Sequence, residues 1–353
     1  MVSTSDLQSR RIDVENSFDA IQDYYDEQGW TDGLPVVPAT EELVRRMLAG
    51  STGAPNDSLG IIQPRNARVT LEKIAINAVM AGCRPEYFPV VVAAVKAMLQ
   101  DEFNVAGVSS TTGGATPAVI VNGPIARQLG INGDAGCFGP GYRANSSIGR
   151  ALRLMIRNVG GLIPGEMDKA TLSTPARFSF CFSENEERSP WEPRHLELGY
   201  SPSDSIVTVA GIRGIYVVME TTVPTGFEVL QTLVGTMTGS GVSNYYQIGT
   251  GAQIVLVLCP EHAADIAASG LSKSDVREYV YQNARMPLRQ LIGVAHYGNR
   301  NWPSWVDEAN PDTMVPIVRS SDDLVVVVAG GEGRHSAWLA GWGVTRIVTQ
   351  QID

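Results

Sequence analysis

The densest cluster of chemically useful side chains follows a run of four valines near the carboxyl end of the sequence. Glycines in the segment 330–333 lead into Arg334, His335 and Ser336. Glycine lets the backbone approach a ligand closely, a guanidinium binds oxyanions, and an imidazole transfers protons near neutral pH. We therefore predict that His335 is catalytic and that Arg334 and Ser336 bind substrate at the start of a helix. A purely structural glycine turn is the alternative interpretation.

The stretch 182–195 is the second candidate, because acids, an amide, a tryptophan and His195 follow an alternating strand pattern there. A carboxyl group and an imidazole can share acid–base work once burial tunes their pKa values. We assign proton transfer to Glu184 and substrate binding to Asn185. A solvated acidic loop is the alternative. Glu187 and His195 would complete a metal site with Glu184, but we expect no bound metal.

Two stretches before expected strands or helices suit an anionic ligand. The first is a set of four hydroxyl residues ahead of two glycines: Ser109, Ser110, Thr111 and Thr112. The second is the Gly-rich segment 133–142, which leads to Arg143 and to Asn145, the expected cap of a helix. Glycine amides and helix N-termini bind carboxylate or phosphate oxygens. We add His262, which follows the apolar stretch 254–258, to the predicted binding residues. A plain turn and a spacer loop are the alternatives.

Cys83 is the candidate nucleophile among four cysteines. It precedes Arg84 at an expected helix start, and both features lower the pKa of a thiol, whereas burial would raise it and leave the thiol inert. The cysteines lack Cys-x-x-Cys spacing and histidine neighbours at zinc-finger spacing. We therefore expect free thiols and no structural zinc.

An internal duplication is expected to position these loops. Residues 107–124 and 241–260 each run from a Gly-Val-Ser turn through an apolar strand to a proline that opens a helix. Alternating strands and helices predict an α/β fold, here two related units with mixed or parallel sheets around a cleft. We expect an N-terminal extended strap and helix in residues 1–60, a first unit in 61–175, and a second unit with a C-terminal strand and Gly-rich loop in 176–353.

Apolar spacing and capping residues also predict individual helices. Thr40 is expected to cap a helix that ends at Leu48, and further helices are expected at 18–28, 69–81, 85–100 and 146–159. In α/β sheets, ligands bind at the carboxyl ends of the strands. The loops after the apolar strands are therefore expected to meet in one pocket.

Composition excludes several classes of function. A net charge of −10 without any basic run argues against a nucleic-acid partner. No apolar stretch reaches the roughly 20 residues that cross a bilayer, and the first residues are polar. We therefore expect no membrane partner and a cytoplasmic location. Apolar residues at 302–305 indicate a surface for a partner, and we expect a homo-oligomer.

Four segments together resemble a known family: 32–38 (DGLPVVP), 75–87 (AINAVMAGCRPEY), 180–187 (FCFSENEE) and 189–193 (SPWEP). They are similar to a poorly characterised bacterial family whose members occur beside, or fused to, small proteins with a selenocysteine-Gly-Ser-Cys (UGSC) motif. This chain has no such motif of its own. The resemblance implies a thiol or selenol redox partner, a small protein, with this chain supplying the substrate site.

These observations favour an enzyme, or the substrate-binding subunit of one, that acts on a small anionic metabolite through a thiol-linked reductive or lyase step. No cofactor is expected beyond the redox partner. A cofactor-free amide-ring hydrolase is one alternative, since repeated α/β units resemble the cyanuric acid hydrolase type, although the Ser-Lys pairs of that type are not evident and only Lys73 and Lys273 lie near suitable loops. A non-catalytic small-molecule binding protein is the other.

Overall fold

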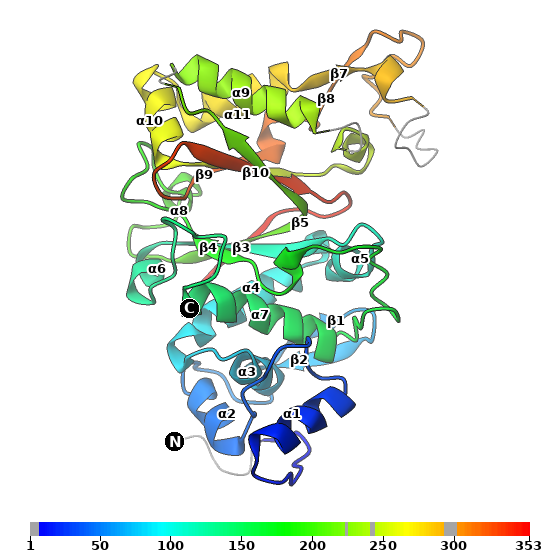
Figure 1. Cartoon of the computed structure of the whole chain (residues 1–353), viewed down its shortest axis with the longest axis vertical. Coiled ribbons are helices and arrows are strands. Elements are labelled where there is room, and N and C mark those ends of the chain that lie inside the picture. Colours follow the sequence, from blue (N-terminus) through cyan, green and yellow to red (C-terminus); the bar gives the residue numbers. More distant parts are fainter. Residues whose placement is uncertain (1–6, 223–224, 241–243, 293–301) are drawn as a thin grey trace.

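A seven-stranded mixed sheet forms the centre of the molecule in the computed structural model, which describes residues 7–222, 225–240, 244–292 and 302–353 (Figure 1). The strand order is β4-β3-β5-β10-β6-β9, and β11 lies beside β5. The bounds are β3 Thr116–Asn122, β4 Cys181–Ser183, β5 Ile206–Met219, β6 Ile254–Leu258, β9 Leu324–Val328, β10 His335–Gly341 and β11 Val348–Gln351. The predicted α/β class with a mixed sheet is confirmed.

Parallel pairs occupy both outer parts of the sheet, and antiparallel strands join them. β3 is parallel to β4 and β6 is parallel to β9, whereas β5 and β10 run antiparallel to each other and to their other neighbours. The 14-residue β5 pairs with β3 and β11 through its first half and with β10 through its second. The β3–β4 pair is thus followed by the antiparallel strands β5 and β11, and the β6–β9 pair by the antiparallel strand β10. The internal duplication and the boundaries at residues 60 and 175 stay predictions, and residues 241–243 lie outside the described residues.

The sheet curls so that one of its faces encloses a shared apolar interior. Alternate residues from six strands meet there, and they include Ala118, Ile120, Phe182, Ala210, Ile212, Val255, Val257, Val325, Val327 and Leu339. The two outer strands come together where they end, because the amide of Asn185 donates to the carbonyl of Val328 at 2.7 Å. We call this junction between the ends of β4 and β9 the seam.

Helices cover the outer face of the curled sheet in two groups (Figure 1). α3 (Leu71–Met80), α4 (Phe88–Met98) and α7 (Arg143–Asn158) share one apolar core with β3 and β5, while α9 (Gly226–Gly239), α10 (Pro260–Ala268) and α11 (Lys273–Asn283) share another with β6, β9 and β10. Smaller elements are α1 Phe18–Glu27, α2 Glu41–Leu48, α5 Val105–Ser110, α6 Pro124–Gln128, α8 Arg194–Glu197, β1 Ser58–Ile62, β2 Ala67–Thr70, β7 Arg285–Pro287 and β8 Met314–Pro316. Among the described helices, none has both the length and the apolar character needed to cross a bilayer.

Local sequence signals explain several of these elements. Thr40 caps α2 as predicted, since its hydroxyl accepts from the amide of Leu43. α4 is apolar on nearly all sides because it is buried on nearly all sides. The segment 29–39 has no regular secondary structure, and the Arg150 side chain of α7 holds it by donating to both carboxylate oxygens of Asp32, at 2.8 and 2.7 Å. Its description as a strap stays a prediction.

Three local predictions are wrong. Residues 107–109 lie within α5 and do not form a turn, because Asn104 accepts from the amide of Gly107 and starts a helix. His335 begins strand β10 and not a helix. Asn145 lies inside α7, which already begins at Arg143, so it does not cap that helix.

Candidate functional site

The carboxyl ends of four strands gather at one end of the curled sheet, together with the Gly-rich segment that follows α6. Backbone hydrogen bonds join Gly330 to Gly133 at 2.8 Å, Ser183 to Asn132 at 3.2 Å and Ala329 to Leu258 at 2.9 Å. At Gly331 a side chain has no room, since a Cβ there would lie 2.6 Å from the Cβ of Ala135. The loops after β3, β4, β6 and β9 are therefore close-packed.

The Ser/Thr stretch lies at the opposite end of β3. Ser109, Ser110, Thr111 and Thr112 precede the strand, whereas the gathered loops follow it, and the strand spans six residue steps or roughly 20 Å. Carbonyls of Ser110 and Thr112 accept from the amides of Lys169 and Thr171. Ser109 is fully buried. The predicted joint binding of one anion by these hydroxyls and the gathered loops is not supported.

Glu184 is the centre of a buried polar network at the seam. Its Oε2 accepts from Asn122 Nδ2 at 2.6 Å and from the amide of Arg194 at 2.9 Å. Its Oε1 accepts from Lys273 Nζ at 3.2 Å and from the amide of Val328 at 3.3 Å. Four donors occupy the lone-pair sites of a carboxylate, and the side chain is 0% exposed. This geometry fits a structural anchor rather than the proton transfer that we predicted for Glu184.

Residues around Glu184 extend the same network. Lys273 also donates to the carbonyl of Glu192 at 2.8 Å, and Arg194 donates to the Thr208 hydroxyl at 3.1 Å. His195 Nδ1 lies 3.5 Å from Glu186 and, although it is buried, has no hydrogen-bond partner among the described residues. Asn185 contributes to the seam through its backbone amide, which donates to the carbonyl of Val328. Within the described ranges, no group of three or more His, Cys, Asp or Glu is arranged to hold a metal.

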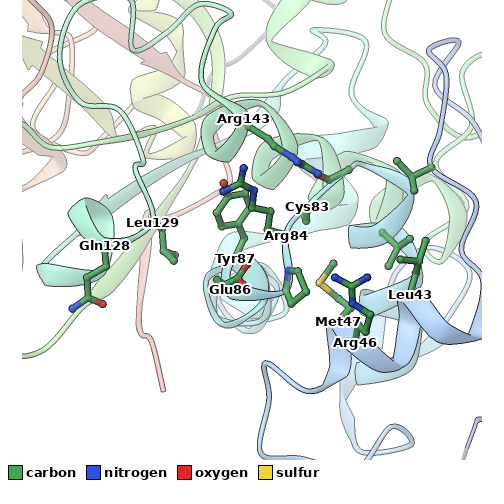
Figure 2. A pocket seen from close by; sticks show the side chains of 14 residues that line it. Leu43, Arg46, Met47, Cys83, Arg84, Glu86, Tyr87, Gln128, Leu129 and Arg143 are labelled. Atoms are coloured by element: carbon green, nitrogen blue, oxygen red, sulfur yellow. The ribbon is translucent and has the colours of Figure 1, made fainter.

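A surface pocket of about 520 Å³ lies between α2, the α3–α4 junction, α6 and α7 (Figure 2). Its polar side chains are those of Arg46, Cys83, Arg84, Glu86, Tyr87, Gln128 and Arg143, and we call it the arginine pocket. In the view of Figure 2, Cys83 lies between Arg143 on one side and Arg46 and Met47 on the other. Two predicted site residues, Cys83 and Arg143, thus line one cavity.

Cys83 does not have the activated thiol that the sequence suggested. Burial raises its pKa to about 12, and this outweighs the opposite effects of a hydrogen bond with Ser147 and of the charges on Arg143 and Arg150. Cys83 belongs to the buried apolar core that α3, α4 and α7 share, and it is 7% exposed as a residue. At neutral pH the thiol is protonated and is a poor nucleophile.

Arg143 and Asn145 have different roles. Arg143 is exposed, and its Nε donates to the carbonyl of Gly82 at 3.0 Å, which holds the side chain over the pocket. Asn145 is buried and holds the Gly-rich segment: it accepts from the amide of Asn132 at 2.8 Å and donates to the carbonyls of Asn132 and Cys137. Asn145 therefore shapes the loop instead of facing a ligand.

The end of β6 and the start of β10 bring together two other predicted residues. His262 Nδ1 and Ser336 Oγ are 2.7 Å apart and both residues are buried. Arg334 forms an ion pair with Asp265 at 2.6 Å, so part of its hydrogen-bonding capacity is already used within the protein. His335 is exposed and contacts the carbonyl of Gly333, two residues away, so the structure does not join it to Glu184. Sequence reasoning placed His262 and Ser336 in the site but missed their neighbour Cys259, although it directly precedes the helix-opening Pro260.

Comparison of the chain with protein-family models and with curated proteins gives no match.

Proposed function

We propose that this protein binds a small anionic metabolite in the arginine pocket. The observation that carries the proposal is the set of three guanidinium groups, from Arg46, Arg84 and Arg143, around one cavity. In the described part of the chain, none of the three forms an ion pair with a carboxylate. The only acidic side chain in the lining is Glu86, so the pocket carries an excess of positive charge.

Size and chemistry support a metabolite rather than a macromolecule. Small-molecule sites have volumes of roughly 300–1,000 Å³, and this pocket has about 520 Å³. Guanidinium groups bind carboxylate and phosphate oxygens through two parallel hydrogen bonds. Tyr87, Met47 and Leu43 supply apolar walls for the rest of the ligand. A small carboxylate or phosphate ester fits both requirements.

The thiol-linked step also remains a proposal, and the structure bears on which thiol would act. A bound anion beside Cys83 would raise the pKa of its thiol further, since a negative charge disfavours a thiolate. We therefore infer that the attacking thiol or selenol comes from the small redox protein that the family resemblance implies. The homo-oligomer and the cytoplasmic location stay predictions as well.

The hydrolase alternative receives no support from the two lysines. Lys273 is bonded to Glu184 and Glu192, and Lys73 donates to the carbonyl of Arg68 at 2.8 Å. Among the residues that the structure describes, neither lysine ammonium bonds a serine hydroxyl that it could activate. A non-catalytic binding protein would use the same pocket, and turnover assays with the redox partner separate it from an enzyme.

Anion binding is tested by calorimetry with phosphate, succinate and citrate. Arg84→Gln should weaken the tightest of these complexes by about ten- to a hundredfold, because a hydrogen bond to a charged group contributes about 1.5–3 kcal/mol. Arg289→Gln is the matched control, since Arg289 is exposed and pairs with Asp312 outside the pocket. Equal affinities of wild type and Arg84→Gln, or no binding of any of the three anions, would contradict the proposal.

A further inference from the structure

A second cavity, of about 850 Å³, lies among α1, α2 and α3, which are grouped at the lower end of Figure 1. The turn between β1 and β2 and the residues 7–16, which we call the N-terminal segment, complete its walls. Three aromatic side chains line it, those of Tyr24, Tyr25 and Trp30, and we call it the aromatic pocket. As far as the structure describes the chain, its lining shares no residue with that of the arginine pocket. Its volume is typical of a small-molecule site, which has roughly 300–1,000 Å³.

The apolar side of α1 borders this cavity. Ile21, Tyr24 and Tyr25 have the spacing of residues on one helix face, and all three line the cavity. No residue of α1 is buried. Hydrogen bonds hold the helix in place instead, since the Gln22 side chain bonds both the amide and the carbonyl of Val36, at 2.9 and 3.1 Å. The apolar side of α1 is therefore free to contact an apolar ligand.

The N-terminal segment is a wall that can detach. It has no regular secondary structure, and several of its aliphatic side chains line the cavity. The amides of Gln8 and Ser9 donate to the two carboxylate oxygens of Glu72, each at 2.9 Å. Farther along, Arg11 forms an ion pair with Glu41 at 2.8 Å. Because these contacts are made to side chains and not to a strand, the segment can move away and admit a ligand without disturbing the core.

The charges around the aromatic pocket favour an anion. Its two acids are the ones that hold the N-terminal segment, so both already have donors. In the described part of the chain, Arg10, Arg65 and Lys73 line the pocket and form no ion pair. Gly161 leaves room for the Arg65 side chain, with which a Cβ at that position would collide. Arg65 thus presents a guanidinium that can bind a carboxylate through two hydrogen bonds.

We propose that the aromatic pocket binds a small aromatic carboxylic acid, with its ring against Tyr24, Tyr25 and Trp30 and its carboxylate on Arg65. Trp30 makes edge-to-face contacts with both tyrosines, and each pair of ring centroids is 6.1 Å apart. Contacts between rings stabilise a complex beyond the burial of apolar area. Binding at this site does not depend on anion binding in the arginine pocket.

Calorimetry with the wild-type protein tests the chemistry of the ligand. Cinnamate should bind, and its neutral amide, cinnamamide, should bind about ten- to a hundredfold more weakly, because it lacks the charge that Arg65 recognises. Nonanoate has the same number of carbon atoms and the same charge but no ring, so it should bind more weakly than cinnamate. The proposal is wrong if cinnamate does not bind, if cinnamamide binds equally well, or if nonanoate binds more tightly.

Trypsin locates the bound ligand on the wild-type protein. Cleavage after Arg10 and Arg11 requires the N-terminal segment to leave the pocket, and cinnamate binds only while this wall is in place. At about ten times its Kd, cinnamate should therefore slow this cleavage about tenfold. Cleavage after Arg289, which is exposed and lies outside the pocket, should keep its rate and is the control. If cleavage after Arg10 and Arg11 is not slowed, cinnamate is bound elsewhere and the proposal fails.

Two variants separate the binding of the carboxylate from the binding of the ring. Arg65→Gln should weaken the cinnamate complex about ten- to a hundredfold and leave the cinnamamide complex unchanged, which also shows that the pocket is intact. Trp30→Ala should weaken both complexes. Arg68→Gln is the matched control, because Arg68 lies on β2 and bonds the carbonyl of Asn56 outside the pocket. Equal cinnamate affinities of Arg65→Gln and Arg68→Gln, or wild-type affinities in Trp30→Ala, would overturn the proposal.

Discussion

Replacing Glu184 by Gln will lower the free energy of unfolding by about 3 kcal/mol, the lower end of the range for breaking a buried ion pair, because the buried Lys273 ammonium then keeps only Glu197, 3.7 Å away, as a countercharge. The Lys273 side chain is 7% exposed and the Glu184 side chain 0%. The amide that replaces one carboxylate oxygen would also face a donor, either from Asn122 and Arg194 or from Lys273 and Val328. Urea unfolding measures the effect.

Glu187→Gln is the control for that experiment. Glu187 pairs with Arg127, and both side chains are about 70% exposed, so the loss should stay below about 1 kcal/mol. The double variant Glu184→Gln, Lys273→Met should recover part of the lost stability, since it removes the buried ammonium together with the carboxylate. A Glu184→Gln protein as stable as Glu187→Gln would show that the network does not hold the seam.

Trp338→Ala will cost about 3–5 kcal/mol, the range for removing a large aromatic side chain from a core. Trp338 is fully buried on β10, where it stacks on Tyr216 of β5 with ring centroids 4.6 Å apart. It also contacts the core that α9, α10 and α11 share with the sheet. Truncation would therefore leave a cavity at the contact between the two central strands.

Trp338→Phe is the informative partner of this variant. The buried indole Nε1 has no hydrogen-bond partner in the described part of the chain, so replacing the indole with an apolar ring removes an unsatisfied donor while keeping much of the packing. We expect the Phe variant to lose less than half of what the Ala variant loses, measured by calorimetric unfolding. If both variants lose the same free energy of unfolding, the indole stabilises the protein through an interaction other than the packing of its ring.

The sequence predicted individual helices better than it predicted which residues contact one another across the fold. Helices such as α2 and α4 follow from caps and apolar spacing within a few residues. The site depends on pairs that are distant in the chain: Lys273 and Glu184 are 89 residues apart, and Cys259 and Ser336 are 77 apart. Only the strand order of the sheet brings such residues together, and local periodicity does not encode that order.

Two errors have the same local origin. The short apolar stretch after Gly333 is compatible with a buried strand as well as with a helix. It forms the strand β10 because it pairs with β5 and β6. Cys83 was chosen for its charged neighbour, but the burial that determines its pKa comes from packing between helices. The arginines of the pocket likewise come from α2, the α3–α4 junction and α7, and no sequence window contains all three.

The seam has a consequence for how the chain behaves when it is partly unfolded. β9 is a run of leucine and four valines at the end of the strand order, and such an apolar edge readily recruits strands from other molecules. In the native protein the segment after β4 meets the end of this edge through Asn185 and Glu184. Closing the curled sheet therefore also protects the protein against aggregation, and damage to the seam exposes the segment best suited to start it.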